Sequence, residues 1–306
     1  MKTSGVKLIA VFGLVSLVWG STWLAIRASL ESLSPLYSAS FRFIFASIFI
    51  LILMKLQGVK IQKDKISVKL YLLQGFFAFI IPFALIYWAE QYIPSGLAAV
   101  LFAAYPFFVA LISYFAIPSE AIGPYKLIGI ILGFTGIVII FWDDLGGDLT
   151  KYLLGMIAVV FSAAMQAGAA VVIKKHGHHL NPLSMNLLPM LMGGVFLFTS
   201  AFVTEDFSAL VFDSNAVISV LYLALFGSVV TFTGYYWLMK RLNIVILSLI
   251  AFITPVLALL LGWIFMSETL SVLDLAGCLF VLAGLIIANL RGLKKIKKAD
   301  IIKDAA

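Results

Sequence analysis

The chain has 306 residues, of which 63% are hydrophobic and only 11% are charged, and its formal net charge is +7. This composition leaves too little polar surface to cover a water-soluble domain of that size, so it excludes a soluble globular protein and predicts an integral membrane protein. Cys278 is the single cysteine, which excludes an intrachain disulfide.

Ten apolar segments follow one another along the chain, separated by short polar turns. They are expected to be helices, because they are too long and too evenly apolar for the alternating strands of a membrane barrel. A helix needs about 20 residues to cross the hydrocarbon core, and the short fifth segment could begin earlier than its apolar run. The sequence therefore predicts an all-α membrane protein with ten spans, at 8–25, 37–54, 70–88, 96–115, 127–142, 152–173, 183–203, 216–239, 244–266 and 273–290.

The two halves of the sequence match one another. Tyr87-Trp88 corresponds to Tyr236-Trp237 at an offset of 149 residues, and the same offset relates Pro106 to Pro255. Each half holds five segments, and an odd number of spans reverses the direction of the chain, so the second half is predicted to be inverted relative to the first. The expected parts are a first repeat at 1–147, a second repeat at 148–292 and a basic tail at 293–306.

The basic residues indicate the orientation. Of 21 Lys and Arg residues, 18 fall on the side of the N-terminus, whereas Arg27 and Lys151 fall on the other side and Arg42 lies inside a span. The positive-inside rule then predicts a multi-pass protein of the inner (cytoplasmic) membrane with both termini in the cytoplasm. The net charge reflects this topology, and the basic tail is expected to face anionic membrane lipid and not nucleic acid.

Several short motifs carry a family resemblance. They are Trp19-Gly20-Ser21, Ser34-Pro35 with Arg42-Phe43, the prolines Pro106 and Pro255, and Ser267-Glu268-Thr269-Leu270 with Gly277 and Gly284. With these motifs the chain resembles the drug/metabolite transporter (DMT) superfamily in its ten-helix form with two EamA domains. The first half departs from the short Glu-containing turn that is usual in the family. Its segment 118–124 begins and ends with proline, so its backbone is expected to be more rigid.

The resemblance implies a secondary transporter whose substrate cavity lies between the two halves, lined mainly by spans 1, 3, 4, 6, 8 and 9. Many bacterial relatives export amino acids or other small metabolites, so we expect a small polar or amphipathic substrate, an amino acid above all, and export by alternating access. The alternative is an integral membrane enzyme that acts on a lipid-linked substrate. The sequence lacks the nucleophile elbow, the zinc motif and the aspartate cluster that such chemistry uses.

Arg42 is a candidate ligand for the substrate. It stands seven residues after Pro35, about 10 Å into the helix, where a charge is costly unless it faces protein or water. It could bind a carboxylate or phosphate of the substrate, or it could be satisfied by backbone carbonyls.

Trp19 and Gln166 occupy equivalent positions in the first and sixth spans, and we expect them on opposite walls of one cavity near the midplane. A buried amide needs a partner, either a neighbouring helix or a ligand. Other aromatic residues could complete an aromatic pocket for an ammonium group, or lie in the interfacial belt of the membrane. These are Tyr87, Trp88, Tyr105, Tyr236 and Trp237.

The helices also contain matched prolines and glycines. Pro106 and Pro255 are predicted to interrupt the fourth and ninth spans at equivalent points, as gates or as fixed bends. The glycines of the fifth and tenth spans are expected to allow close helix packing. The same two spans are a candidate dimer face, so the protein is expected to be a monomer or a weak homodimer.

No cofactor or metal site is predicted. The run Lys174 to His179 is expected to lie in a short cytoplasmic turn without nearby carboxylates or thiols, so a solvated basic loop is favoured over a metal site. Glu90 and Glu268 could each carry a coupling proton, but their places near span ends favour ordinary solvated carboxylates.

Overall fold

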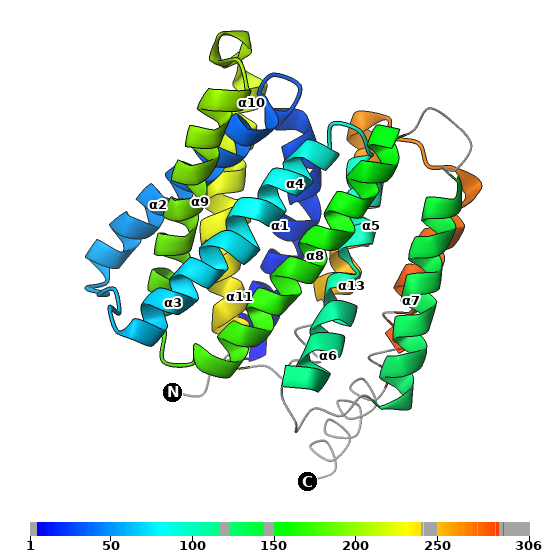
Figure 1. The fold of residues 1–306 in the computed structure, drawn as a ribbon, viewed down its shortest axis with the longest axis horizontal. Coiled ribbons are helices and arrows are strands. Elements are labelled where there is room, and N and C mark those ends of the chain that lie inside the picture. Colours follow the sequence, from blue (N-terminus) through cyan, green and yellow to red (C-terminus); the bar gives the residue numbers. More distant parts are fainter. Residues whose placement is uncertain are drawn as a thin grey trace.

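The structure is a computed structural model, and it describes residues 5–116, 123–143, 150–239, 241, 250–273, 275–284, 286–287 and 290. The basic tail and the segments at 117–122 and 242–249 therefore lie outside the described residues. Within the described ranges the chain forms helices and turns, and the helices stand side by side in one bundle (Figure 1).

The first repeat contains eight helical elements in the described part. They are α1 (Gly5–Ser29), α2 (Pro35–Leu56), α3 (Lys65–Gln74), the π-helix η1 (Gly75–Ile80), α4 (Ile81–Ala89), α5 (Ser95–Phe102) and α6 (Tyr105–Ala116), and α7 (Pro124–Asp143) follows them as the fifth span. The fifth span thus begins before its apolar run, as its length suggested.

The second repeat follows the same order. Its elements are α8 (Thr150–His176), α9 (Pro182–Thr204), the 3-10 helix η3 (Phe207–Ala209), α10 (Ser214–Ala224), the π-helix η4 (Leu225–Val230), α11 (Thr231–Met239), α13 (Ile250–Met266) and a tenth-span helix at Leu275–Gly284. Seven helices of the described residues are long and apolar enough to cross a membrane, and three shorter apolar helices account for the other spans. The predicted all-α, ten-span architecture is confirmed.

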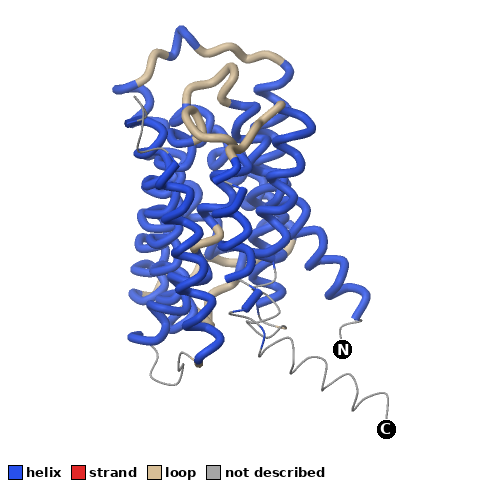
Figure 2. The backbone as a smooth tube through the Cα atoms, turned by 90° about the vertical axis from the view of Figure 1, so that its right-hand side faces the viewer, coloured by secondary structure: helices blue, strands red, loops and turns tan. Residues whose placement is uncertain are grey.

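The turns gather at the two ends of the bundle (Figure 2). We call the end with turns 30–34, 90–94, 205–213 and 267–271 the outer end, and the end with turns 57–64 and 177–181 the inner end, in keeping with the topology predicted from the sequence. Side chains cap several helices at these ends. Ser67 donates hydrogen bonds that lower the pKa of the Asp64 carboxyl at the inner end, and hydrogen bonds from Ala216 and Ser32 lower the pKa of Asp213 at the outer end.

The third span of each repeat has the same irregularity. In the first repeat η1 separates α3 from α4, and in the second η4 separates α10 from α11. Pro82 follows η1 and lacks the amide hydrogen that a continuous α-helix would use. At the equivalent place Thr231 donates its hydroxyl to the Gly227 carbonyl at 2.8 Å. A π-helical turn inside an α-helix often marks a functional site.

The two matched prolines behave differently. At Pro106 the span is interrupted, because α5 ends at Phe102 and α6 begins at Tyr105. At Pro255 the predicted interruption is wrong, because α13 continues through this residue. Proline is tolerated inside membrane helices, where neighbouring groups can satisfy the carbonyl that it leaves free.

Glycines bring the fifth and tenth spans into backbone contact, which confirms their predicted packing role. A Cβ at Gly136 would lie 2.5 Å from the Gly277 carbonyl oxygen and 2.7 Å from the Val281 nitrogen. A Cβ at Gly284 would lie 2.6 Å from the Gly129 carbonyl oxygen. These are backbone atoms, which cannot swing aside as the end of a side chain can.

Alanine at Gly136 is therefore expected to destabilise the protein by about 1–3 kcal/mol through overpacking. The matched control is Gly13→Ala, because a Cβ at Gly13 meets no atom within 4 Å, and in a helix alanine is favoured over glycine by up to about 1 kcal/mol. Thermal unfolding of the purified variants in detergent measures both effects. A Gly136 variant as stable as the Gly13 variant would contradict the close contact between the two spans.

Candidate substrate site

Arg42 lies in the interior, between the second span of one repeat and the third span of the other. Its side chain is 2% exposed. Nε donates to the Ser228 hydroxyl at 3.0 Å, Nη2 donates to the Gly227 carbonyl at 3.2 Å, and Nη1 donates to the Tyr87 hydroxyl at 3.4 Å. Ser228 and Gly227 belong to η4, so the π-helical turn supplies two of the three acceptors.

The positive charge of Arg42 has no counter-ion in the described part of the chain. No carboxylate there lies within salt-bridge distance, and the guanidinium instead stands 4.9 Å from the centre of the Phe83 ring. A guanidinium has five N–H donors, and the protein uses three of them in hydrogen bonds. Both interpretations of Arg42 are therefore supported. Its hydrogen bonds to η4 fit a structural role, and its remaining N–H donors and its charge suit a substrate carboxylate or phosphate.

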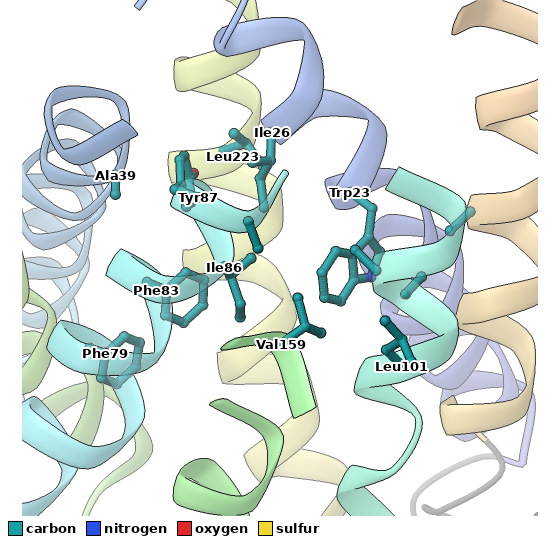
Figure 3. Close-up of a cluster of buried hydrophobic side chains, with 14 of the residues drawn as sticks. Trp23, Ile26, Ala39, Phe79, Phe83, Ile86, Tyr87, Leu101, Val159 and Leu223 are labelled. Atoms are coloured by element: carbon teal, nitrogen blue, oxygen red, sulfur yellow. The ribbon is translucent and has the colours of Figure 1, made fainter. Parts of the chain in front are cut away.

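A chain of ring contacts leads from Arg42 toward the inner end. Phe83 stacks on Phe79 with 6.0 Å between ring centroids, and Phe79 lies 5.5 Å from Phe232 of α11. Trp19 lies 5.4 Å from Phe232 and 5.1 Å from Tyr235. Phe79, Phe83 and Tyr87 follow one another along the third span in Figure 3. We call the series Phe83, Phe79, Phe232, Trp19 and Tyr235 the aromatic path.

The aromatic path ends at a group of hydroxyl and amide side chains. Tyr105, at the break between α5 and α6, is in hydrogen-bonding contact with Tyr235, and the ring of Tyr236 lies 5.9 Å from that of Tyr235. Gln74 donates from Nε2 to the Tyr236 hydroxyl at 3.3 Å. Gln74 is 2% exposed, and its Oε1 has no hydrogen-bond partner among the described residues. We call Gln74, Tyr105, Tyr235 and Tyr236 the tyrosine cluster.

The structure thus brings three predicted residues, Trp19, Tyr105 and Tyr236, into one connected group. It places Tyr87 elsewhere, beside Arg42. Inversion of the repeats explains the separation, since equivalent positions of oppositely directed spans lie toward opposite ends of the bundle.

Trp88 and Trp237 lie near the two ends. Trp88 packs edge-on against Tyr92 at 5.1 Å. The Arg241 guanidinium lies 4.2 Å from the centre of the Trp237 ring, and the Lys7 ammonium lies 5.6 Å from it. Aromatic rings beside basic residues at span ends are typical of the membrane interface, so these two tryptophans fit the belt interpretation.

Gln166 lies in α8, one turn after Ser162, whose hydroxyl donates to the Pro82 carbonyl at 3.1 Å. Residues four apart share a helix face, so Gln166 faces the region of η1. Its Nε2 is buried and has no hydrogen-bond partner in the part of the chain that is described. No contact of the described residues joins Gln166 to Trp19, and their common cavity stays a prediction.

Sequence analysis missed Gln74, Phe232, Tyr235 and Ser228. Gln74 carried the clearest signal, because it is an amide inside an apolar span. Tyr235 directly precedes Tyr236, and only the helix geometry shows which of the two rings reaches Trp19.

The histidine-containing turn needs one correction. A carboxylate does lie near it, because folding brings Asp64 to 3.9 Å from His179 Nε2, and the Ser67 hydroxyl lies 3.0 Å from the same atom. Asp64 is distant in sequence, so the expectation of a turn without a nearby carboxylate was wrong. Over the described ranges no group of three or more His, Cys, Asp or Glu side chains could hold a metal ion.

Several known proteins that are similar to this chain are named as transporters. The chain is 26% identical over 271 residues to the uncharacterized transporter YoaV of Bacillus subtilis, an alignment that covers 89% of this chain and 92% of YoaV. It is 29% identical over 276 residues to the uncharacterized inner membrane transporter YedA of Escherichia coli K12, covering 88% of this chain and 87% of YedA. A crystal structure with 18% identity superposes with a TM-score of 0.70 over 95% of this chain and 99% of the other, which shows the shared fold.

The sequence profile of the EamA-like transporter family matches the chain twice, at residues 6–142 and 153–290. The two matches together span most of the protein, and the relatives that align with nearly its whole length are named as transporters. The chain belongs to the EamA-like transporter family of the DMT superfamily, and it is a multi-pass membrane transporter and not an enzyme.

Proposed function

We propose that the protein exports a small amphipathic metabolite with both a carboxylate and an amino group, most simply an amino acid, across the cytoplasmic membrane. The observation that carries the proposal is Arg42, a buried cation at one end of the aromatic path that has no counter-ion among the described residues. A substrate carboxylate would supply the missing negative charge, and a charged partner inside a low-dielectric site is strongly favoured.

The remaining features suit the rest of such a molecule. Aromatic faces bind ammonium groups through cation–π attraction and also pack against apolar side chains. The tyrosine cluster offers hydroxyl and amide groups in a largely apolar setting, which is typical of small-molecule sites.

Alternating access of the two inverted repeats would carry the substrate across. Both termini would lie in the cytoplasm, as the distribution of basic residues predicts. The irregular turns η1 and η4, together with the break before Pro106, lie next to the residues of the proposed site. Such helix interruptions are places where a span can bend during the conformational change.

Counterflow in proteoliposomes tests this function. Vesicles loaded with an unlabelled mixture of neutral amino acids are placed in a trace of labelled leucine or phenylalanine. We expect uptake of at least one unmodified labelled amino acid. Competition then compares three matched compounds: the transported amino acid, the amine that lacks its carboxylate and the acid that lacks its amino group. The account expects only the amino acid to compete well.

Two results would contradict the proposal. If no amino acid exchanges through reconstituted protein that retains its fold, the substrate class is wrong. If the amine competes as well as the amino acid does, the carboxylate is not recognised, and Arg42 serves the fold alone.

A further inference from the structure

Glu90 is a buried carboxyl group that the proposed transport site does not use. It follows Ala89, the last residue of α4 and of the third span, and it is 0% exposed. Neither carboxyl oxygen has a hydrogen-bond partner among the described residues. The expectation of a solvated carboxylate at this position was therefore wrong, because the outer end closes over it.

The turn that contains Glu90 lies where the two repeats contact one another at the outer end. Arg27 of α1 donates from Nη1 to the backbone carbonyl of Glu90 and not to its carboxyl group. The nearby Glu268 carboxylate, which belongs to the second repeat, accepts hydrogen bonds from the first turn of α5. Its donors are Ser95 N at 2.7 Å, Ser95 Oγ at 3.0 Å and Gly96 N at 3.1 Å. A helix N-terminus favours a negative charge, so the Glu268 side chain is a suitable partner for the start of α5.

The carboxyl groups of Glu90 and Glu268 therefore lie in different surroundings. Burial, and after it the negative charge of Glu268, raises the pKa of the Glu90 carboxyl well above its usual value, while Arg27 and Arg42 act in the opposite direction. Ionising a carboxyl group without water or hydrogen bonds costs much more than leaving it protonated. The charged or titratable groups on the elements around Glu90 are Arg27, Arg42, Tyr87, Tyr92, Lys151, Tyr152 and Glu268.

We propose that Glu90 is a proton-binding site whose protonated form keeps the outer end of the transporter closed. The geometry favours a proton over a metal cation. The positive charges of Arg27 and Arg42 act on the group, and they would repel a metal ion. The proposal rests on the alternating access described above.

A simple cycle follows from this arrangement. When the outer end opens, water reaches Glu90, and the carboxyl group transfers its proton to water and becomes a carboxylate. A second negative charge beside Glu268 then opposes closure, because like charges in a partly buried site repel. Closure requires the carboxylate to take a proton back from the outer medium. Low external pH should thus favour the closed outer end.

Infrared spectroscopy of the reconstituted protein tests the proton site itself. At neutral pH we expect a carbonyl stretching band from a protonated carboxylic acid, and we expect this band to be lost in Glu90→Gln, which has the same shape but cannot ionise. The proposal would be overturned if the wild type lacked the band, or if Glu90→Gln kept it unchanged.

Distance measurements between spin labels test the link to closure. In a Cys278→Ala background, labels at Gln91→Cys and Val272→Cys would report on the outer end, and both positions are exposed. We expect longer distances to become more populated as pH rises in the otherwise wild-type protein. Glu90→Gln should remove this dependence, whereas Glu31→Gln, at an exposed carboxylate of the same end, should keep it.

The proposed link between Glu90 protonation and closure would be overturned if the distance distribution did not change with pH, or if it changed equally in Glu90→Gln. Neither spectroscopic experiment needs a substrate. Failure of the amino-acid counterflow together with a Glu90-dependent band and distance change would therefore count against the proposed substrate alone.

Discussion

Replacing Arg42 with methionine is expected to abolish transport and to lower the stability of the protein. The change removes hydrogen bonds to Ser228, Gly227 and Tyr87, and each bond to a charged group contributes about 1.5–3 kcal/mol. It also removes the charge that would attract the substrate carboxylate. Thermal unfolding measures the loss of stability, and counterflow by folded protein at low temperature measures the loss of transport.

Two further variants separate the contributions. Tyr87→Phe removes only the longest of the three bonds, at 3.4 Å, and because this bond is weaker than the other two the change should cost only about 0.5–1.5 kcal/mol of stability. Arg42→Lys keeps the charge but cannot reach three acceptors at once, so it should be less stable than the wild type while it transports better than Arg42→Met. Equal transport by the lysine and methionine variants would mean that the charge plays no part in substrate recognition.

Trp19→Ala is expected to reduce transport about tenfold or more while the protein reaches the membrane in normal amounts. The change removes two ring contacts, each worth about 0.5–1.5 kcal/mol beyond burial, and it removes the aromatic face that links Phe232 to Tyr235 in the aromatic path. Trp19→Phe should retain part of the activity. Trp237→Ala is the matched control, because Trp237 packs with basic side chains near the inner end.

Gln166→Ala belongs to the same hypothesis. Loss of a buried hydrogen bond from its amide to the substrate should cost about 1–3 kcal/mol, or roughly five- to 150-fold in affinity. Substrate binding to the two purified variants tests whether these residues contact the substrate. Unchanged affinity in both Trp19→Ala and Gln166→Ala would place the substrate elsewhere, with the tyrosine cluster as the next candidate.

Much of the fold could be predicted because lipid imposes a simple rule on the sequence. Each span needs a long apolar run, so the ten segments and their order were visible, and the offset of 149 residues between the halves revealed the repeat. The turns η1 and η4 could not be predicted, because their segments GFFAFI and LFGSVV contain no charged residue and no proline that would mark an irregular turn. Their widened geometry depends on Pro82 in one repeat and on the hydroxyl of Thr231 in the other.

The candidate site was predictable only in part. Hydropathy identifies Arg42 and Gln166 as unusual, but it does not show that Arg42 binds η4 of the other repeat. Inversion also separates residues that the alignment pairs, as with Tyr87 and Tyr236. Glu90 was misjudged because closeness to a span end usually means exposure, whereas contacts from α1 and from the second repeat bury it.

Two-sided labelling of a single cysteine tests alternating access most directly. Thr233 lies one turn from Tyr236 in α11, and its buried hydroxyl has no hydrogen-bond partner among the described residues. In a Cys278→Ala background, Thr233→Cys should react with an impermeant thiol reagent from either face of the membrane, and added substrate should slow both reactions. Gln91→Cys should react only from the outer face. If Thr233→Cys reacts from one face under every condition, the alternating-access account is contradicted.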